Sequence, residues 1–266
     1  MWAVLNGTIV NAFTVAAGSL IGLSAASRIS ERYRTIVLTT LGLVTVTLGV
    51  DAAVLGFADT VRKFAPDVRH SETYGARLGM VMVGSLILGA IIGTRLQLQR
   101  RIEQLGALIH ARFAEGDGHR FAEGFLTASV IFCVGPLTLL GCLRNGTPPH
   151  NPDFLYIKAF LDGFCSMALA ASLGWGVFAS VATVLLFQGG LSLLAFWGAA
   201  GLDELSRSLM TVVGGVVLLA TALLLLDLKK IPVADLLPGI FLPPAIIWLA
   251  ERVSPGILLP LTAATA

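Results

Sequence analysis

Charged residues are scarce in this chain of 266 residues: Asp, Glu, Lys and Arg make up 13% of it, and hydrophobic residues make up 56%. A soluble domain carries roughly 25% charged residues, because it needs a polar surface to remain in water. The deficit excludes an ordinary soluble fold and indicates a polytopic membrane protein. The formal net charge is only +2. Lys and Arg lie in loops between apolar runs as topology signals, so no nucleic-acid partner is expected.

Residues suited to catalysis or metal binding are also sparse. The cysteines Cys133, Cys142 and Cys165 form no CxxC pair and have no histidine at ligand spacing, so we interpret them as small buried hydrophobic residues. No metal or cofactor is expected. No HExxH or GxSxG motif is present, so an enzyme is not expected. Interfacial chemistry by His119 with Glu123, four residues away, is the enzymatic alternative.

Long apolar runs dominate the rest of the sequence. A bilayer core of about 30 Å requires about 20 apolar residues per helix, and eight runs are candidates by this measure. They are approximately Ala3–Ala26, Thr35–Phe57, Tyr74–Leu96, Phe121–Leu143, Phe154–Leu173, Val177–Ala200, Ser208–Leu226 and Ala234–Ala250. The predicted fold class is all-α: one integral membrane domain over residues 1–266, a transmembrane bundle of seven or eight spans.

Individual residues, and not hydropathy alone, indicate the turn between the fifth and sixth spans and the shape of the eighth. The fifth and sixth runs share one uncharged stretch, in which Leu173–Gly176 ("LGWG") is the plausible turn. The eighth run contains Pro238, Pro243 and Pro244. Because proline removes a helical hydrogen bond, we expect this span to be kinked or partly re-entrant.

Two segments resemble each other: "FAEGFLTASVIFCVG", Phe121–Gly135, and "FLDGFCSMALAASLG", Phe160–Gly174. They begin or lie within consecutive spans, which run in opposite directions. Such a pair predicts an inverted repeat with a pseudo-two-fold axis in the membrane plane. Several transporters are built in this way, with the binding site near the interface between the repeats.

Each copy places a carboxylate and a hydroxyl four residues apart, on one helix face. The pairs are Glu123 with Thr127 and Asp162 with Ser166, and the first copy adds Ser129. Carboxylates in apolar spans cost about 2.5–3.5 kcal/mol at the helix centre on insertion scales, so they are functional candidates. We predict that the two oxygen-lined stripes meet and bind a cation or a solute that carries hydrogen-bond donors.

A purely structural interpretation of the acids remains open. Each acid lies near the beginning of its apolar run, where the helix dipole favours a negative charge and water can hydrate it. Lys158 also lies four residues before Asp162 and could simply pair with it.

Polar residues and helix breakers inside spans add further candidates. Asn11 and Gln188 lie in the middle of spans and need partners within the bundle. Gly189 and Gly190 follow Gln188 and could loosen the helix there.

A second helix break is predicted at Gly135 and Pro136 in the fourth span. Proline has no N–H, so Pro136 frees the carbonyl of Phe132 in the middle of the membrane. Transporter sites tend to lie at such breaks.

Small residues recur at four-residue spacing in two spans, as Gly18 with Gly22 and as Ser85, Gly89 and Gly93. Stripes of this kind let helix backbones approach closely. They predict packing faces and are compatible with a homo-oligomer without requiring one.

Four segments together resemble a known family. They are "NGTIVNAFTVAAGSLIGL", "FAEGFLTASVIFCVGPLTLLG", "KAFLDGFCSMALAASLGWGVF" and "LLLLDLKKIPVADLLPGIFLPP". The chain is similar over nearly its whole length to the bacterial inner-membrane family of domain of unknown function 554, the YqgA/YdfK-like proteins. The resemblance implies a multi-pass protein of the bacterial cytoplasmic membrane, and it carries no activity.

The sequence therefore supports two functions. The first is a secondary transporter or channel-like carrier of an ion or small polar solute, with a proton or a cation as the coupling species. The alternative is a non-transporting membrane scaffold or sensor component. The expected partners are the lipid bilayer and, for a carrier, its small-molecule or ion substrate.

Overall fold

The computed structural model describes residues 1–24, 31–65, 68–104, 119–133, 135–198 and 201–258. The elements formed by these residues are helices, and no strand is found among them. Contacts between residues divide the chain into two compact units. Unit 1 comprises Met1–Leu41 and Arg100–Ala200, and unit 2 comprises Gly42–Gln99 and Gly201–Ala266.

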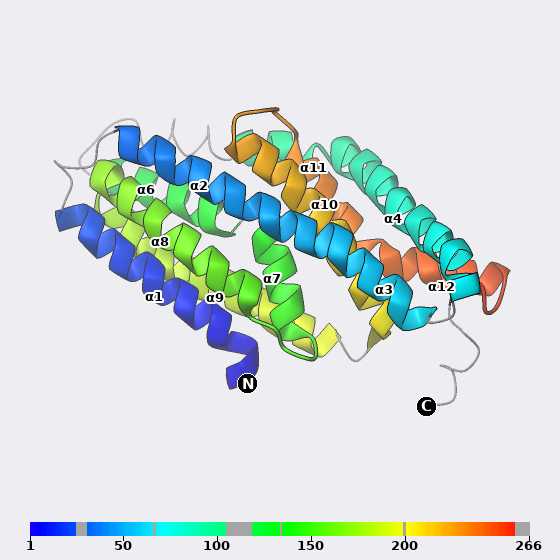
Figure 1. Ribbon diagram of the computed structural model, residues 1–266. Helices are drawn as coiled ribbons and strands as arrows, with labels where there is room; N and C mark the ends of the chain where they lie inside the picture. Colours follow the sequence, from blue (N-terminus) through cyan, green and yellow to red (C-terminus); the bar gives the residue numbers. More distant parts are fainter. Residues whose placement is uncertain (25–30, 66–67, 105–118, 134, 199–200, 259–266) are drawn as a thin grey trace. The chain divides into compact units, whose positions relative to one another are not determined.

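Unit 1 is built mainly from three long helices and one broken helix (Figure 1). Its helices are α1 (Trp2–Ser24), α6 (His119–Cys133), α7 (Pro136–Gly146), α8 (Asp153–Leu173) and α9 (Trp175–Gly198). Its core includes Val15, Phe132 and Val184, which come from α1, α6 and α9.

Helix α2 (Glu31–Val50) begins within unit 1 and ends within unit 2. It continues through a π-helical segment, Asp51–Leu55, into α3 (Gly56–Phe64). The remaining helices of unit 2 are α4 (Val68–Leu96), α10 (Glu204–Leu225), α11 (Val233–Leu236), a 3₁₀ segment at Leu237–Phe241, and α12 (Pro243–Val253).

The predicted all-α polytopic bundle is confirmed. Six of the described helices are long and apolar enough to cross a membrane, and the number rises to eight if each of two bent helix pairs counts as one span. The predicted turn between the fifth and sixth spans is also present, because α8 ends at Leu173 and α9 begins at Trp175. Gly174 adopts φ 78° and ψ −153° there, a positive-φ conformation that glycine reaches without steric strain.

Both predicted interruptions coincide with bends. The axes of α6 and α7 differ by 57°, and Pro136 is the first residue of α7. In unit 2, the helical stretch Val233–Phe241 and α12 differ by 43°, and α12 begins at Pro243. Proline is well tolerated in the first turn of a helix, where its missing N–H has no intrahelical partner.

The predicted small-residue stripes pack against other helices of the same chain. A Cβ atom on Gly18 or Gly22 of α1 would overlap the backbone of α8, at Gly163 or Met167. In unit 2, Gly89 of α4 similarly contacts the 3₁₀ segment, and Gly93 contacts the backbone of α11. These glycines therefore allow close helix contacts within each unit, as expected for membrane helices.

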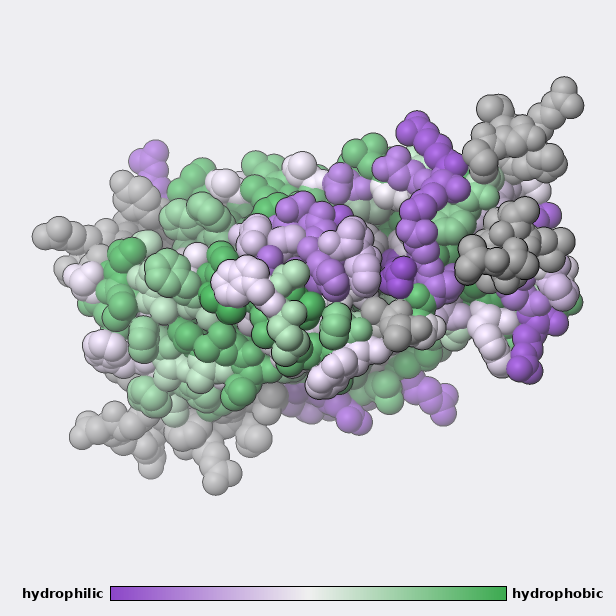
Figure 2. Space-filling view, turned by 90° about the horizontal axis from the view of Figure 1, so that it is seen from below, coloured by the Kyte–Doolittle hydropathy of each residue, from purple (hydrophilic) through white to green (hydrophobic). Residues whose placement is uncertain are grey.

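Hydrophobic residues cover a large part of the face shown in Figure 2, beside a hydrophilic region. Phe13, Met80 and Leu186 are 72%, 68% and 78% exposed, and each lies on a helix that is apolar enough to cross a membrane. Such exposure suits a surface that faces lipid, because hydrocarbon does not penalise apolar side chains.

Candidate functional site

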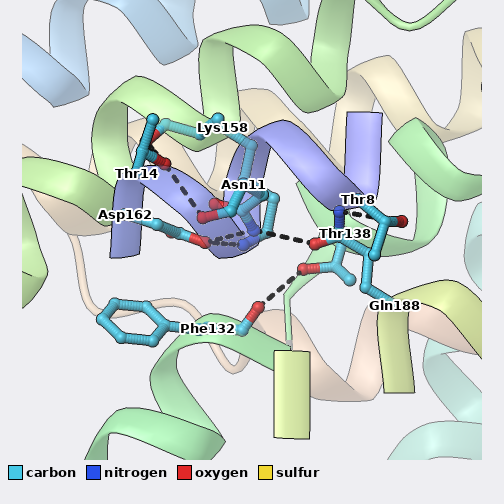
Figure 3. A network of polar contacts seen from close by, with 9 residues as sticks. Thr8, Asn11, Thr14, Phe132, Thr138, Lys158, Asp162 and Gln188 are labelled. Carbon is cyan, nitrogen blue, oxygen red and sulfur yellow. Dashed lines mark hydrogen bonds and ion pairs between the residues drawn. The ribbon is translucent and has the colours of Figure 1, made fainter. Parts of the chain in front are cut away.

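Polar side chains from three helices of unit 1 meet in its interior (Figure 3). The Nδ2 atom of Asn11, on α1, donates to the Oδ2 atom of Asp162 on α8 and to the Oε1 atom of Gln188 on α9, both at 2.9 Å. Asn11 and Gln188 are completely buried, and Asp162 is 8% exposed. The predicted candidates Asn11, Asp162 and Gln188 thus lie together, in what we call the polar cluster.

The cluster extends to Thr8, which the sequence did not single out, and to Cys142, which the sequence indicated only as a buried hydrophobic residue. Gln188 donates from Nε2 to the Thr8 hydroxyl at 3.3 Å, and its backbone carbonyl accepts the Cys142 thiol at 3.4 Å. Thr8 lies three residues before Asn11 and therefore on the same face of α1. That spacing is the signal in the sequence that could have identified it.

Lys158 supplies a positive charge to the cluster. Its ammonium donates to the Oδ2 atom of Asp162, one turn along α8, so the i, i+4 pairing left open by the sequence is confirmed. Lys158 is only 4% exposed, so the pair is not a hydrated pair at the helix end. A buried ion pair of this kind is costly to form and more costly to break, because the remaining charge then has no partner.

The cluster lies near the middle of each helix that contributes to it. Asn11, Asp162 and Gln188 are central in α1, α8 and α9, which have 23, 21 and 24 residues. Because helices of this length match the thickness of the hydrocarbon core, we expect the polar cluster to lie near the middle of the membrane.

The break between α6 and α7 lies at about the same depth. The broken helix runs antiparallel to α8, since Gly124 contacts Leu173 near one end and Gly141 contacts Leu155 near the other. Gly135 is therefore roughly level with Asp162. The Phe132 carbonyl beside the break accepts the Thr138 hydroxyl at 3.3 Å (Figure 3), so a side chain replaces the missing helical donor.

Two groups in the cluster retain unused hydrogen-bonding capacity. The Oδ1 atom of Asn11 is buried and has no hydrogen-bond partner among the described residues. The Lys158 ammonium has three N–H donors, and Asp162 is its hydrogen-bond partner in the described part of the chain. Buried polar groups are normally paired, so an open acceptor and open donors suit a site that takes a further group.

The predicted meeting of the two acids is wrong. Glu123 precedes Gly124, which packs against Leu173 at the end of α8. Leu173 lies about three turns beyond Asp162, roughly 16 Å along the helix axis. The antiparallel arrangement of the two segments is the physical reason, because it places their opening residues at opposite ends of the contact.

The remaining residues of the predicted stripes are also separated. Ser129 donates to the Thr183 hydroxyl of α9 at 3.0 Å, and Thr127 is half-buried on α6. Ser166 donates to the Gly163 carbonyl within α8 at 2.8 Å and lies against Gly18 of α1. None of these three hydroxyls contributes a hydrogen bond to the polar cluster in the described residues.

The predicted helix break at Gly189 and Gly190 is wrong. Helix α9 continues through both residues to Gly198. A Cβ atom on Gly189 would lie 3.7 Å from the Thr8 side chain, and one on Gly190 would have no neighbour within 4 Å. A Cβ atom would therefore fit at either position, and neither glycine interrupts the helix.

These helices and their apolar surface define a multi-pass membrane protein. A family model described as "Protein of unknown function (DUF554)" matches residues 6–248, so the chain belongs to this family. The "Uncharacterized membrane protein YdfK" of Bacillus subtilis (strain 168) is 28% identical over 244 residues, which cover 91% of this chain and 95% of that protein. The "Uncharacterized protein YqgA" of Escherichia coli (strain K12) is 28% identical over 254 residues, covering 92% and 97%. No solved structure matches the chain significantly.

Proposed function

We propose that this protein is a carrier in the bacterial cytoplasmic membrane that moves an ion or a small polar solute through the polar cluster of unit 1. The observation that carries this proposal is a charged, hydrogen-bonded cluster near the middle of three apolar helices. Ionisable residues at this depth are costly and characteristically mark substrate or ion pathways. The broken helix α6–α7 beside the cluster adds support, because carriers often form their sites at discontinuous helices.

The open hydrogen-bonding groups favour a binding role over a purely structural one. A cluster that only holds helices together gains most when all its buried polar groups are paired. Here the Oδ1 atom of Asn11 has no partner in the described chain. A bound solute that donates a hydrogen bond to this oxygen, or a cation that this oxygen coordinates, would remove the penalty of leaving it unpaired.

Transport by purified protein in proteoliposomes tests the proposal, with Asp162→Asn as the variant and Glu123→Gln as the matched control. The probes are sodium, potassium, succinate, inorganic phosphate and glycerol. We expect Asp162→Asn to reduce net uptake of the transported probe at least ~10-fold, because it removes the negative charge of the cluster. Glu123→Gln makes the same chemical change about three helical turns away, and we expect uptake within about twofold of wild type.

Two outcomes would count against a carrier at this site. If net uptake by Asp162→Asn is as fast as by wild type, the cluster is a structural feature of the bundle. If the folded wild-type protein moves none of the probes, the result favours the alternative of a non-transporting scaffold or sensor component.

A further inference from the structure

We propose that the Lys158–Asp162 pair makes the carrier an electroneutral symporter of one small monovalent anion with one proton. In this scheme a proton binds to the Asp162 carboxylate, and the Lys158 ammonium, released from that carboxylate, binds the anion. This inference rests on the proposed function and specifies the chemical class of its substrate and its coupling ion.

The groups around Asp162 are arranged to stabilise negative charge. Its Oδ2 atom accepts from the Lys158 ammonium and from the Nδ2 atom of Asn11. A metal cation would need oxygen ligands such as the Asp162 carboxylate. The positive charge of Lys158, which already pairs with that carboxylate, would repel it. The pair therefore favours an anion beside Lys158 over a cation beside Asp162.

Charge balance in a low-dielectric site couples the two substrates. The empty site is neutral, because the charges of Lys158 and Asp162 cancel. The site with both substrates is also neutral, because the anion cancels Lys158 and the proton cancels Asp162. Binding either substrate alone leaves one uncompensated buried charge, which disfavours that form by about 100-fold or more. The carrier therefore switches the site from one side of the membrane to the other only when the site is empty or holds both the anion and the proton.

Few other ionisable groups face this pair. The sequences of α1 and α9 contain no ionisable side chain. The other ionisable side chains of α6, α7 and α8 belong to His119, Arg120, Glu123, Cys133, Cys142, Arg144, Asp153, Tyr156 and Cys165. Of these, the Cys133 thiol is within electrostatic range of both members of the pair, and the Cys142 thiol is within range of Lys158. Arg144 instead stacks over the Phe154 ring at 4.3 Å.

The amides beside Asp162 can serve both protonation states. With Asp162 ionised, Asn11 donates to Asp162 and to Gln188, and Gln188 donates to Thr8. With Asp162 protonated, its O–H needs an acceptor. Rotation of the Asn11 and Gln188 amides by 180° would let the unpaired Asn11 Oδ1 accept from Asp162 and from Gln188. The Thr8 hydroxyl would then donate to Gln188. The three hydrogen bonds that link Asp162, Asn11, Gln188 and Thr8 are thus kept, each with donor and acceptor exchanged.

The test is proton entry into proteoliposomes that contain a trapped pH-sensitive dye. An inward gradient of gluconate, chloride or, at pH 6, inorganic phosphate is imposed, so that each anion carries mainly one negative charge, while potassium and valinomycin set the membrane potential. We expect at least one anion to drive proton entry, with an initial rate that changes less than about twofold over 100 mV. A step that moves one net charge across the membrane would instead be biased by about 50-fold over this range.

Two variants separate the roles of the two charges. In Asp162→Asn, the charge of Lys158 has no partner unless an anion is bound, so the empty site cannot change sides. Exchange of internal for external anion is therefore expected to persist, while net uptake falls at least ~100-fold. The double variant Lys158→Met/Asp162→Asn has no buried charge. It is expected to remain folded and to lose both net uptake and exchange, so it controls for misfolding of the single variant.

The outcomes distinguish this inference from the proposed function. If sodium, potassium or glycerol moves and the three anions do not, the protein is a carrier but proton–anion symport is wrong. Anion uptake that varies steeply with potential, or exchange that persists in the double variant, also overturns the inference. If the folded protein moves none of the probes, both proposals fall.

Discussion

Replacing Lys158 by Met alone is expected to destabilise the protein by about 3–5 kcal/mol, because it leaves Asp162 as an uncompensated charge among apolar helices. Lys158 is 4% exposed and Asp162 is 8% exposed, so water has little access to either charge. Asn11 would remain as a hydrogen-bond donor to Asp162. One amide cannot replace a full positive charge, so we expect the loss to be large.

The double replacement Lys158→Met/Asp162→Asn is expected to recover most of that stability. Removing both charges of a buried pair is often neutral or stabilising, whereas removing one is not. Unfolding in detergent, followed by tryptophan fluorescence, compares wild type, Lys158→Met, Asp162→Asn and the double variant under the same conditions. If the two single replacements are each mild and their effects simply add, the pair is hydrated and does not lie in the interior.

Replacing Gly176 by Ala is expected to destabilise unit 1 by about 1–3 kcal/mol, the usual range for overpacking. A Cβ atom at this position would overlap the backbone carbonyl of Phe121. A backbone atom cannot move aside by changing a rotamer, so α6 and α9 would have to separate. Because their packing holds the broken helix beside the cluster, we also expect transport to fall.

Gly190→Ala on the same helix is the matched control. A Cβ atom there meets no atom within 4 Å, and alanine favours a helix over glycine by up to about 1 kcal/mol. We therefore expect stability equal to or slightly above that of wild type. The fraction of each variant that elutes as a single folded species from a sizing column, after heating in detergent, gives the comparison. Equal losses in the two variants would show that close contact between α6 and α9 is not required.

Hydropathy determined much of what could be predicted about the fold. The bilayer imposes one length on every span and requires its backbone hydrogen bonds to be satisfied internally. The spans were therefore visible as apolar runs, and proline and glycine marked the bends near Pro136 and Pro243 and the turn at Gly174. Hydropathy contains no comparable information about which spans pack together, so the grouping of α1 with α8 and α9 had to come from the structure.

The candidate site was predicted one residue at a time but not as a set. Asn11 and Gln188 stood out because each is a polar amide in the middle of an apolar span, and their shared hydrogen bond follows from that isolation. Resemblance between two segments was a weaker guide. It paired Glu123 with Asp162 by sequence position, although antiparallel helices bring equivalent positions together only near the centre of their contact.

Lys158 shows why local spacing alone could not decide between structure and function. Its i, i+4 distance from Asp162 predicts the ion pair in either case. Only the packing of α1 and α9 against α8 buries the pair and brings Asn11 and Gln188 to it. Burial changes a modest surface interaction into a site where a single unpaired charge is strongly disfavoured.

Transport by the double variant Lys158→Met/Asp162→Asn, set beside wild type in the same proteoliposomes, tests most directly whether the polar cluster of unit 1 is the working site. We predict that the double variant elutes and unfolds like wild type but moves neither anion nor proton, in uptake or in exchange. A double variant that carries the anion and the proton at the wild-type rate would contradict a transport role for this pair.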